Sequence, residues 1–201
     1  MFKRFQPGEA VTGVSNLKSS AQRAICNDLV NLYAPLGEGD PPLVKRLLPT
    51  KKSGHEKVFS VKCKDHVQML ALGEDHKLPL FFKTRDGVWY PTLRLVHRLR
   101  LAGGDGACFM PRVQVDRGAI PYILGGANVM CPGLTGDGAD MPEDLAAGTP
   151  VCIFAEGKKL PLAVGVLKMS TADIAGKNKG IGIEVVHHLD DGLWRTTTLV
   201  V

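Results

Sequence analysis

The stretch that decides the fold is VDRGAIPYILGGANVMCPGL, which runs from Val115 to Leu134. It holds four glycines and two prolines, but only one arginine and no lysine. It is too apolar for a flexible loop and too rich in glycine for one regular helix. We expect a short helix that Asp116 caps and Gly125-Gly126 ends, followed by a strand and a turn at Pro132-Gly133.

Small residues at Gly125, Gly126 and Ala127 let another backbone approach closely. That backbone is either a neighbouring strand or a phosphate–sugar chain, and packing arguments alone favour the strand. Pro121 falls inside the expected helix, where it removes one hydrogen bond and crowds the carbonyl four residues back. The helix is therefore expected to begin later or to kink.

The flanking segments predict two domains. On the N-terminal side we expect a helix over 15–33 with Ser15 as its cap, a short helix over 41–48, an antiparallel meander of three strands and a helix over 90–101. A glycine-rich break at 102–112 follows, and beyond it five strand-like runs dominate, the last covering 193–201, with one helix that Ser170 caps. The predicted fold is an α+β N-terminal domain, residues 1–108, followed by a small mostly-β barrel, residues 109–201.

The composition of the chain limits the classes of protein to which it can belong. The chain has 201 residues, 44% of them apolar, which is enough for a hydrophobic core. No run approaches the roughly 20 apolar residues of a membrane span, and MFKRFQPGEA lacks the apolar run of a secretory signal, so we expect a cytosolic or nuclear protein. The five cysteines are an odd number without a CxxC pair, which favours free, buried or half-buried thiols.

Charge is distributed unevenly along the chain. The formal net charge is +5. Residues 1–110 carry 17 Lys and Arg against 10 Asp and Glu, whereas residues 111–201 carry 8 against 10. The basic N-terminal part is therefore predicted to face an acidic partner, although solvated surface charge explains the same numbers.

Motifs for catalysis are absent from the sequence. GKNKGIG at 176–182 is not a Walker A motif, since no Gly-Lys-Ser/Thr follows at the required spacing, and neither GxSxG nor HExxH occurs. His187 and His188 are adjacent on an expected strand, so one is predicted to be buried and the other exposed. Cys63, His66 and His55 lack a fourth ligand for zinc. We expect no enzyme, no metal and no cofactor.

The opening stretch, together with GTPVCIFAE, LAVGVLKMS and KGIGIEVVHHLDDGLW, resembles a PUA domain. With MFKRF at the start, LFF at 80–82 and YPTLRLVH at 90–97, the chain resembles the malignant T-cell-amplified sequence family nearly end to end. The connections at 34–42 and 98–109 look longer than those of the family, and TGDGAD at 135–140 adds two acids beside the expected RNA face.

The resemblance implies a non-enzymatic, cytoplasmic translation factor with an N-terminal α+β domain and a PUA RNA-binding domain. It implies a heterodimer with density-regulated protein on the small ribosomal subunit, in contact with ribosomal RNA and tRNA. The implied roles are reinitiation, post-termination recycling and non-standard initiation with delivery or release of tRNA.

Two sets of residues are candidates for contact with RNA. By resemblance to PUA domains, the RNA-binding candidates are Arg117, Gly125, Gly126, Ala127, Asn128, Gly133, Lys168, Lys177 and Lys179. A second basic set is a candidate ribosomal RNA surface, namely Lys3, Arg4, Lys45, Arg46, Lys51, Lys52, Arg94, Arg98 and Arg100. The alternative roles are fold-determining glycines, a turn-satisfying Asn128 and ordinary solvated lysines and arginines.

Two other functions remain open at this point. PUA domains often accompany RNA modification, so the chain could be an accessory subunit of a modifying enzyme. The negative balance of the C-terminal part also allows a protein-interaction adaptor whose PUA-like barrel does not bind RNA. Salt dependence separates these cases, because contacts to phosphate weaken steeply with salt.

Overall fold

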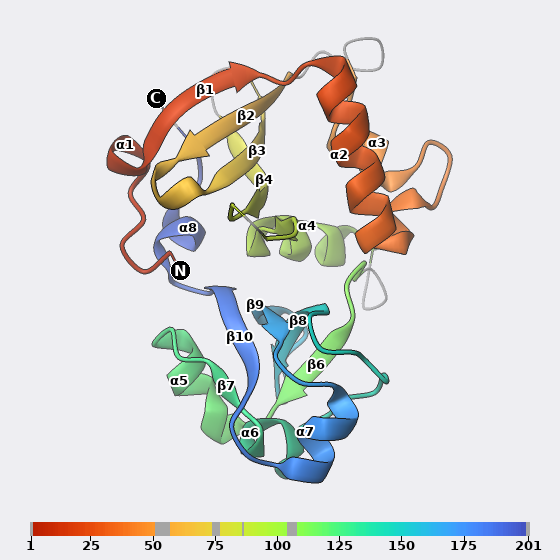
Figure 1. The fold of residues 1–201 in the computed structure, drawn as a ribbon, viewed down its shortest axis with the longest axis vertical. Coiled ribbons are helices and arrows are strands. Elements are labelled where there is room, and N and C mark those ends of the chain that lie inside the picture. Colours follow the sequence, from red (N-terminus) through yellow and green to blue (C-terminus); the bar gives the residue numbers. More distant parts are fainter. Residues whose placement is uncertain (1, 51–56, 74–76, 86, 104–107, 200–201) are drawn as a thin grey trace. The chain divides into compact units, whose positions relative to one another are not determined.

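Two five-stranded sheets organise the computed structural model, which describes residues 2–50, 57–73, 77–85, 87–103 and 108–199 (Figure 1). The chain packs into two units. The N-terminal unit contains residues 5–91 and the tail from Thr196, and the C-terminal unit contains residues 92–195 and the N-terminal residues up to Arg4. None of the helices in these described ranges is long and apolar enough to span a membrane.

The sheet of the N-terminal unit is antiparallel, with strand order β1-β2-β3-β4-β5. Its strands are β1 (Val11–Asn16), β2 (Val58–Cys63), β3 (Gln68–Leu72), β4 (Leu78–Lys83) and β5 (Tyr90–Pro91). Strands β2 to β4 confirm the predicted meander. Their valine-, leucine- and phenylalanine-rich sequences bury Val61, Met69 and Phe82 completely. The dipeptide Asp86-Gly87 in the sequence also predicts a hairpin-type turn, but Asp86 lies outside the described residues.

The N-terminal unit also contains helices and 3₁₀ turns. They are α1 (Pro7–Ala10), α2 (Ser19–Leu32), the 3₁₀ turn η1 (Ala34–Gly37), α3 (Leu43–Leu47) and the 3₁₀ turn η2 (Lys64–His66). The predicted Ser15 cap is wrong, because Ser15 lies in β1 opposite Ser60 and the helix begins after Lys18. Pairing with β2 outweighs the local helical pattern there. The Gln22 amide on α2 donates to the Leu48 carbonyl at 2.8 Å, which ties the helix to the end of α3.

The sheet of the C-terminal unit has the order β6-β8-β9-β10-β7 and forms half of a barrel. Its strands are β6 (Arg112–Val115), β7 (Val129–Met130), β8 (Pro150–Ala155), β9 (Pro161–Leu167) and β10 (Ile181–His188). β6 pairs in parallel with β8, and the other pairs are antiparallel. A Cβ at Gly165 would lie 2.8 Å from the Glu184 carbonyl oxygen, so glycine permits the close approach of β9 and β10.

The helices of the C-terminal unit are α4 (Leu93–Gly103), the 3₁₀ turn η3 (Arg117–Ala119), α5 (Ile120–Leu124), α6 (Pro132–Thr135), α7 (Thr171–Lys177) and α8 (Gly192–Arg195). The Ser170 cap of α7 is confirmed, since its hydroxyl accepts from the Asp173 N–H. The strand predicted over 193–201 is wrong, because Asp191 caps a helical turn and accepts from the Trp194 N–H at 2.8 Å.

Helix α4 packs with the C-terminal unit, where the His97 Nε2 donates to the Pro161 carbonyl at 2.8 Å. The sequence places this helix before the predicted domain boundary between residues 108 and 109. Residues 104–107 of the glycine-rich break lie outside the described residues, and the boundary stays a prediction.

Candidate nucleic-acid interface

The glycine-rich stretch forms a corner between β6 and β7 in the C-terminal unit. The Asp116 carboxylate accepts from the Ala119 N–H at 2.8 Å, which confirms the predicted cap. After the turn η3, α5 begins at Ile120 and takes Pro121 in its first turn, where the missing N–H has no helical partner to lose. The delayed start predicted from Pro121 is therefore confirmed.

Gly126 ends the helix in the left-handed conformation, with φ +85°. Its N–H donates to the Ile123 carbonyl at 2.9 Å, and the next N–H, from Ala127, donates to the Tyr122 carbonyl. A Cβ at Gly126 would lie 3.2 Å from the His188 Nε2. Glycine is required here both for the backbone conformation and for the approach of His188.

An apolar groove of about 480 Å³ opens beside this corner. Tyr122 of α5, Met130 of β7 and Ile181 of β10 line it and are 70%, 49% and 43% exposed. Its other lining residues are Asp116, Gly118, Ala119, Ile123, Ala127, Asn128, Val129, Pro132 and Gly133. Exposed apolar side chains that gather around one hollow mark a binding surface more strongly than single exposed ones.

Asn128 holds β10 against the corner. Its side-chain oxygen accepts from the Val185 N–H at 3.0 Å, beside the irregular register between Val185 and His187 where β10 departs from β9. The side chain thus satisfies a backbone donor near an interrupted ladder. This contact supports the structural role considered for Asn128.

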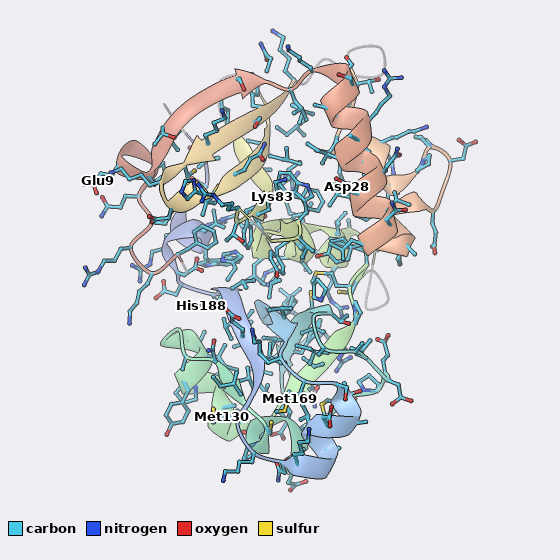
Figure 2. The ribbon with its side chains drawn as sticks, viewed as in Figure 1. Glu9, Asp28, Lys83, Met130, Met169 and His188 are labelled. Atoms are coloured by element: carbon cyan, nitrogen blue, oxygen red, sulfur yellow. The ribbon has the colours of Figure 1, made fainter. Side chains whose placement is uncertain are left out.

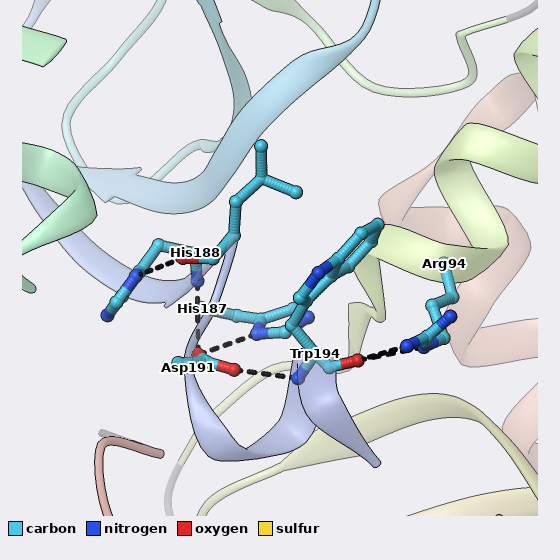
Figure 3. Close-up of polar contacts among 6 residues, drawn as sticks. Arg94, His187, His188, Asp191 and Trp194 are labelled. Carbon is cyan, nitrogen blue, oxygen red and sulfur yellow. Dashed lines mark hydrogen bonds and ion pairs between the residues drawn. The ribbon is translucent and has the colours of Figure 1, made fainter. Parts of the chain in front are cut away.

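A buried network lies behind the corner (Figure 3). The His187 Nδ1 donates to the Asp191 carboxylate at 2.7 Å, and the same carboxylate accepts from the His188 N–H at 3.1 Å. The prediction of one buried and one exposed histidine is wrong, because both are buried. The register shift between Val185 and His187 breaks the alternation on which that prediction rested.

Burial sets the titration of this network. It lowers the pKa of His187, and the hydrogen bond to Asp191 opposes that effect. Burial acts to raise the pKa of Asp191, but hydrogen bonds from His187 and from the N–H groups of Trp194 and His188 hold it below its ordinary value. Because Asp191 accepts from His187 and from the N–H groups of His188 and Trp194, the network ties the end of β10 to α8.

The predicted RNA-binding residues separate into two groups. Ala127, Asn128 and Gly133 line the groove, and Gly125 and Gly126 adjoin it. The four predicted cations, Arg117, Lys168, Lys177 and Lys179, do not line it, and three of them pair with carboxylates. The pairs are Arg117–Glu156 at 3.3 Å, Lys168–Glu184 at 3.1 Å and Lys177–Asp173 at 2.9 Å.

The candidate ribosomal RNA surface is divided between the units. Lys3, Arg4 and Arg98 are exposed in the C-terminal unit, and Lys45 and Arg46 are exposed in the N-terminal unit. Lys51 and Lys52 lie outside the described residues. Contact of the exposed members with ribosomal RNA stays a prediction.

Two members of that set are used inside the C-terminal unit. Arg100 is only 7% exposed and donates to the Lys159 carbonyl at 3.0 Å, so its assignment to a surface is wrong. The half-buried Arg94 donates to the Trp194 carbonyl, and its guanidinium lies 4.7 Å from the centre of the Trp194 ring (Figure 3). Both arginines stabilise packing through charge-assisted and cation–π contacts.

The groove residues that sequence reasoning missed are Tyr122, Met130 and Ile181. Their only signal is that each is a large apolar residue beside a glycine-rich or turn segment. No group of three or more His, Cys, Asp or Glu in the described parts of the chain is arranged to hold a metal. His55 of the considered cluster lies outside those parts. The five free cysteines are buried or half-buried, as predicted.

Comparison with known proteins agrees with this architecture. Residues 5–99 match the Pre-PUA-like domain, and residues 110–192 match the family described as elF2D, PUA domain. The chain is 44% identical over 197 residues to Malignant T-cell-amplified sequence 1 homolog of Drosophila melanogaster, with 98% of each chain covered. It is 39% identical over 196 residues to Translation machinery-associated protein 20 of Schizosaccharomyces pombe, again with 98% of each covered.

A solved structure shares the fold. The crystal structure of a hypothetical protein from Pyrococcus horikoshii OT3 matches with a TM-score of 0.71 at 25% identity, over 92% of this chain and 99% of that one. Together the matches confirm the predicted fold class, an α+β domain followed by a small mostly-β PUA barrel.

Proposed function

Because the chain belongs to the malignant T-cell-amplified sequence family, we propose that it is a non-enzymatic translation factor that binds RNA through its PUA domain. The observation that supports the proposal is the apolar groove beside the glycine-rich corner between β6 and β7. It combines an exposed aromatic side chain, Tyr122, with small residues that admit a backbone.

The groove has the chemistry that unpaired RNA requires. An unstacked base presents an apolar face, and stacking on an aromatic side chain contributes about 1–3 kcal/mol per base. Tyr122 offers such a face, and Met130 and Ile181 offer apolar contact around it. Gly118 and Gly133 in the lining leave room for a sugar–phosphate chain to approach.

We extend the proposal to the setting in which the factor works. It acts in the cytoplasm as a heterodimer with density-regulated protein on the small ribosomal subunit. Its roles are reinitiation, recycling of post-termination subunits and non-standard initiation with delivery or release of tRNA. Support comes from the near-full-length similarity to the family and from the name of the fission yeast relative, Translation machinery-associated protein 20.

A protein-interaction adaptor is a second candidate, which one specific observation favours. Three of the four predicted RNA-binding cations are already paired with carboxylates, so they offer little free charge to phosphate. An apolar peptide segment would fit the same groove. Binding of that kind would change little with salt, whereas binding to RNA weakens with it.

Co-sedimentation with purified small ribosomal subunits across a salt series tests the proposal, with and without density-regulated protein. We expect binding that needs the partner and falls with salt. Tyr122→Ala should weaken binding of a single-stranded RNA by at least fivefold, because one stacked base is lost. Leu124→Ala is the matched control, since Leu124 is exposed on the same helix but does not line the groove. Equal affinities for the two variants would remove the groove from the RNA-binding surface.

A further inference from the structure

Basic side chains gather at one end of the sheet in the N-terminal unit. We call this region the basic sheet end and define it as Lys62, Lys64, Lys83 and Arg85. It lies where β2 turns into β3 and where β4 finishes, and Lys83 is labelled in Figure 2. None of these residues belongs to the sets considered above.

Strand register places two of the lysines in one row. Lys62 pairs with Gln68, and Gln68 pairs with Lys83, so the three side chains stand side by side on one face of the sheet. Adjacent strands lie about 4.8 Å apart, which separates the two lysines by roughly 10 Å. Gly13 continues the row on β1, and open space lies where its side chain would be.

A turn with unusual backbone geometry extends the row. Asp65 and His66 are consecutive non-glycine residues with φ of +55° and +57°, a conformation that costs about 1–2 kcal/mol per residue. The turn presents the His66 ring to Arg85, whose Nη2 lies 3.2 Å from Nδ1 and 3.0 Å from Nε2. The guanidinium is thereby held at the surface with donors left over for another acceptor.

None of the ion pairs among the described residues involves these four side chains. The acids beside them in the sequence are Asp65, which is exposed on the turn, and Asp86, which lies outside the described residues. The Lys83 ammonium lies 4.8 Å from the centre of the Trp89 ring, which orients the side chain without neutralising it. The cations near the PUA corner, by contrast, are mostly paired.

We propose that the basic sheet end binds the phosphate backbone of RNA, a step that rests on the proposed RNA-binding function. Two point charges about 10 Å apart and an oriented arginine fork suit a chain of phosphates. The four residues that define the surface are lysines and an arginine, which suit contact with phosphates rather than the reading of bases. It supplies the electrostatic affinity that the groove lacks.

Fluorescence anisotropy with a labelled 20-base-pair RNA duplex tests the inference, because a duplex offers phosphates but no unstacked base for the groove. Lys62→Ala with Lys83→Ala should lower the slope of log affinity against log salt by about 2, or about 1 for each phosphate contact. The matched control is Lys18→Ala with Arg23→Ala, which removes the same charge from exposed positions at and near the start of α2. Lys64→Ala alone should lower the slope by about 1, and circular dichroism verifies that each variant is folded.

The outcomes separate the two proposals. An unchanged slope in the double variant, or an equal fall in the control, overturns the role of the basic sheet end. Binding of single-stranded RNA through Tyr122 without any binding of the duplex overturns it also, but leaves the proposed function intact. Failure of the wild-type chain to bind either RNA refutes both. Loss of an acidic protein partner in the double variant, with duplex binding unchanged, would reassign the surface to protein.

Discussion

Replacing Gly126 with alanine tests how the corner is built. A non-glycine residue in the left-handed region costs about 1–2 kcal/mol, and the new Cβ would meet the His188 Nε2 at 3.2 Å. Alanine recovers about 0.4–1 kcal/mol by restricting the unfolded chain. With roughly 1 kcal/mol added for displacing the buried His188, Gly126→Ala should lower the free energy of unfolding by about 2 kcal/mol.

Two other glycines, Gly148 and Gly125, separate the conformational contribution from the contact with His188. Gly148 has φ +87° and nothing within 4 Å of its added Cβ, so Gly148→Ala should cost about 1 kcal/mol from conformation alone. Gly125 has φ −77°, so Gly125→Ala should change stability by less than about 0.5 kcal/mol. Urea unfolding followed by circular dichroism measures all three variants. Equal effects at Gly125 and Gly126 would refute the argument from backbone conformation and the approach of His188.

Two more predictions follow from titratable groups. Asp191→Asn should lower stability at pH 7 by about 2 kcal/mol, since it weakens charge-assisted bonds to His187 and to backbone N–H groups. Because the pKa of Asp191 is held below its unfolded value near 4, its contribution is complete above about pH 4 and is lost as pH falls further, so the variant should show a shallower acid-unfolding curve. A hydrogen bond with Cys152 lowers the pKa of Cys108 to about 7, so iodoacetamide should alkylate Cys108 with a midpoint near pH 7 and leave the buried Cys152 unmodified. Peptide mass spectrometry measures both sites, and a Cys108 midpoint above pH 8.5 contradicts the prediction.

Local chemistry in the sequence was enough to predict much of the C-terminal corner. Asp116 directly precedes the helical run, and the pair Gly125-Gly126 directly follows that run. The N-cap and the end of the helix can therefore both be predicted from adjacent residues. The delayed helix start follows from Pro121 in the same way. The meander of β2 to β4 is readable because each strand is a short run of β-favouring residues.

Features that depend on distant partners were not predictable in this way. The groove joins Tyr122, Met130 and Ile181, whose approach depends on the pairing of β7 with β10. The exposure of one of the two histidines, His187 or His188, was predicted wrongly because a register shift in β10 leaves no trace in residue alternation. The Lys177–Asp173 pair is visible as a four-residue spacing, whereas the Lys168–Glu184 pair forms only when β9 meets β10.

The path of the chain limits how this protein can be cut and recombined. The Phe2 carbonyl accepts from the Gly192 N–H inside the C-terminal unit, and the Leu199 N–H donates to the Lys77 carbonyl inside the N-terminal unit. Each unit therefore includes a short segment from the opposite end of the sequence: residues up to Arg4 belong to the C-terminal unit, and residues from Thr196 belong to the N-terminal unit. Division of the chain near residue 108 would leave each fragment without the short terminal segment that hydrogen-bonds to it. Exchange of the PUA domain between relatives as a single cassette should yield poorly folded chimeras unless both terminal segments are exchanged with it.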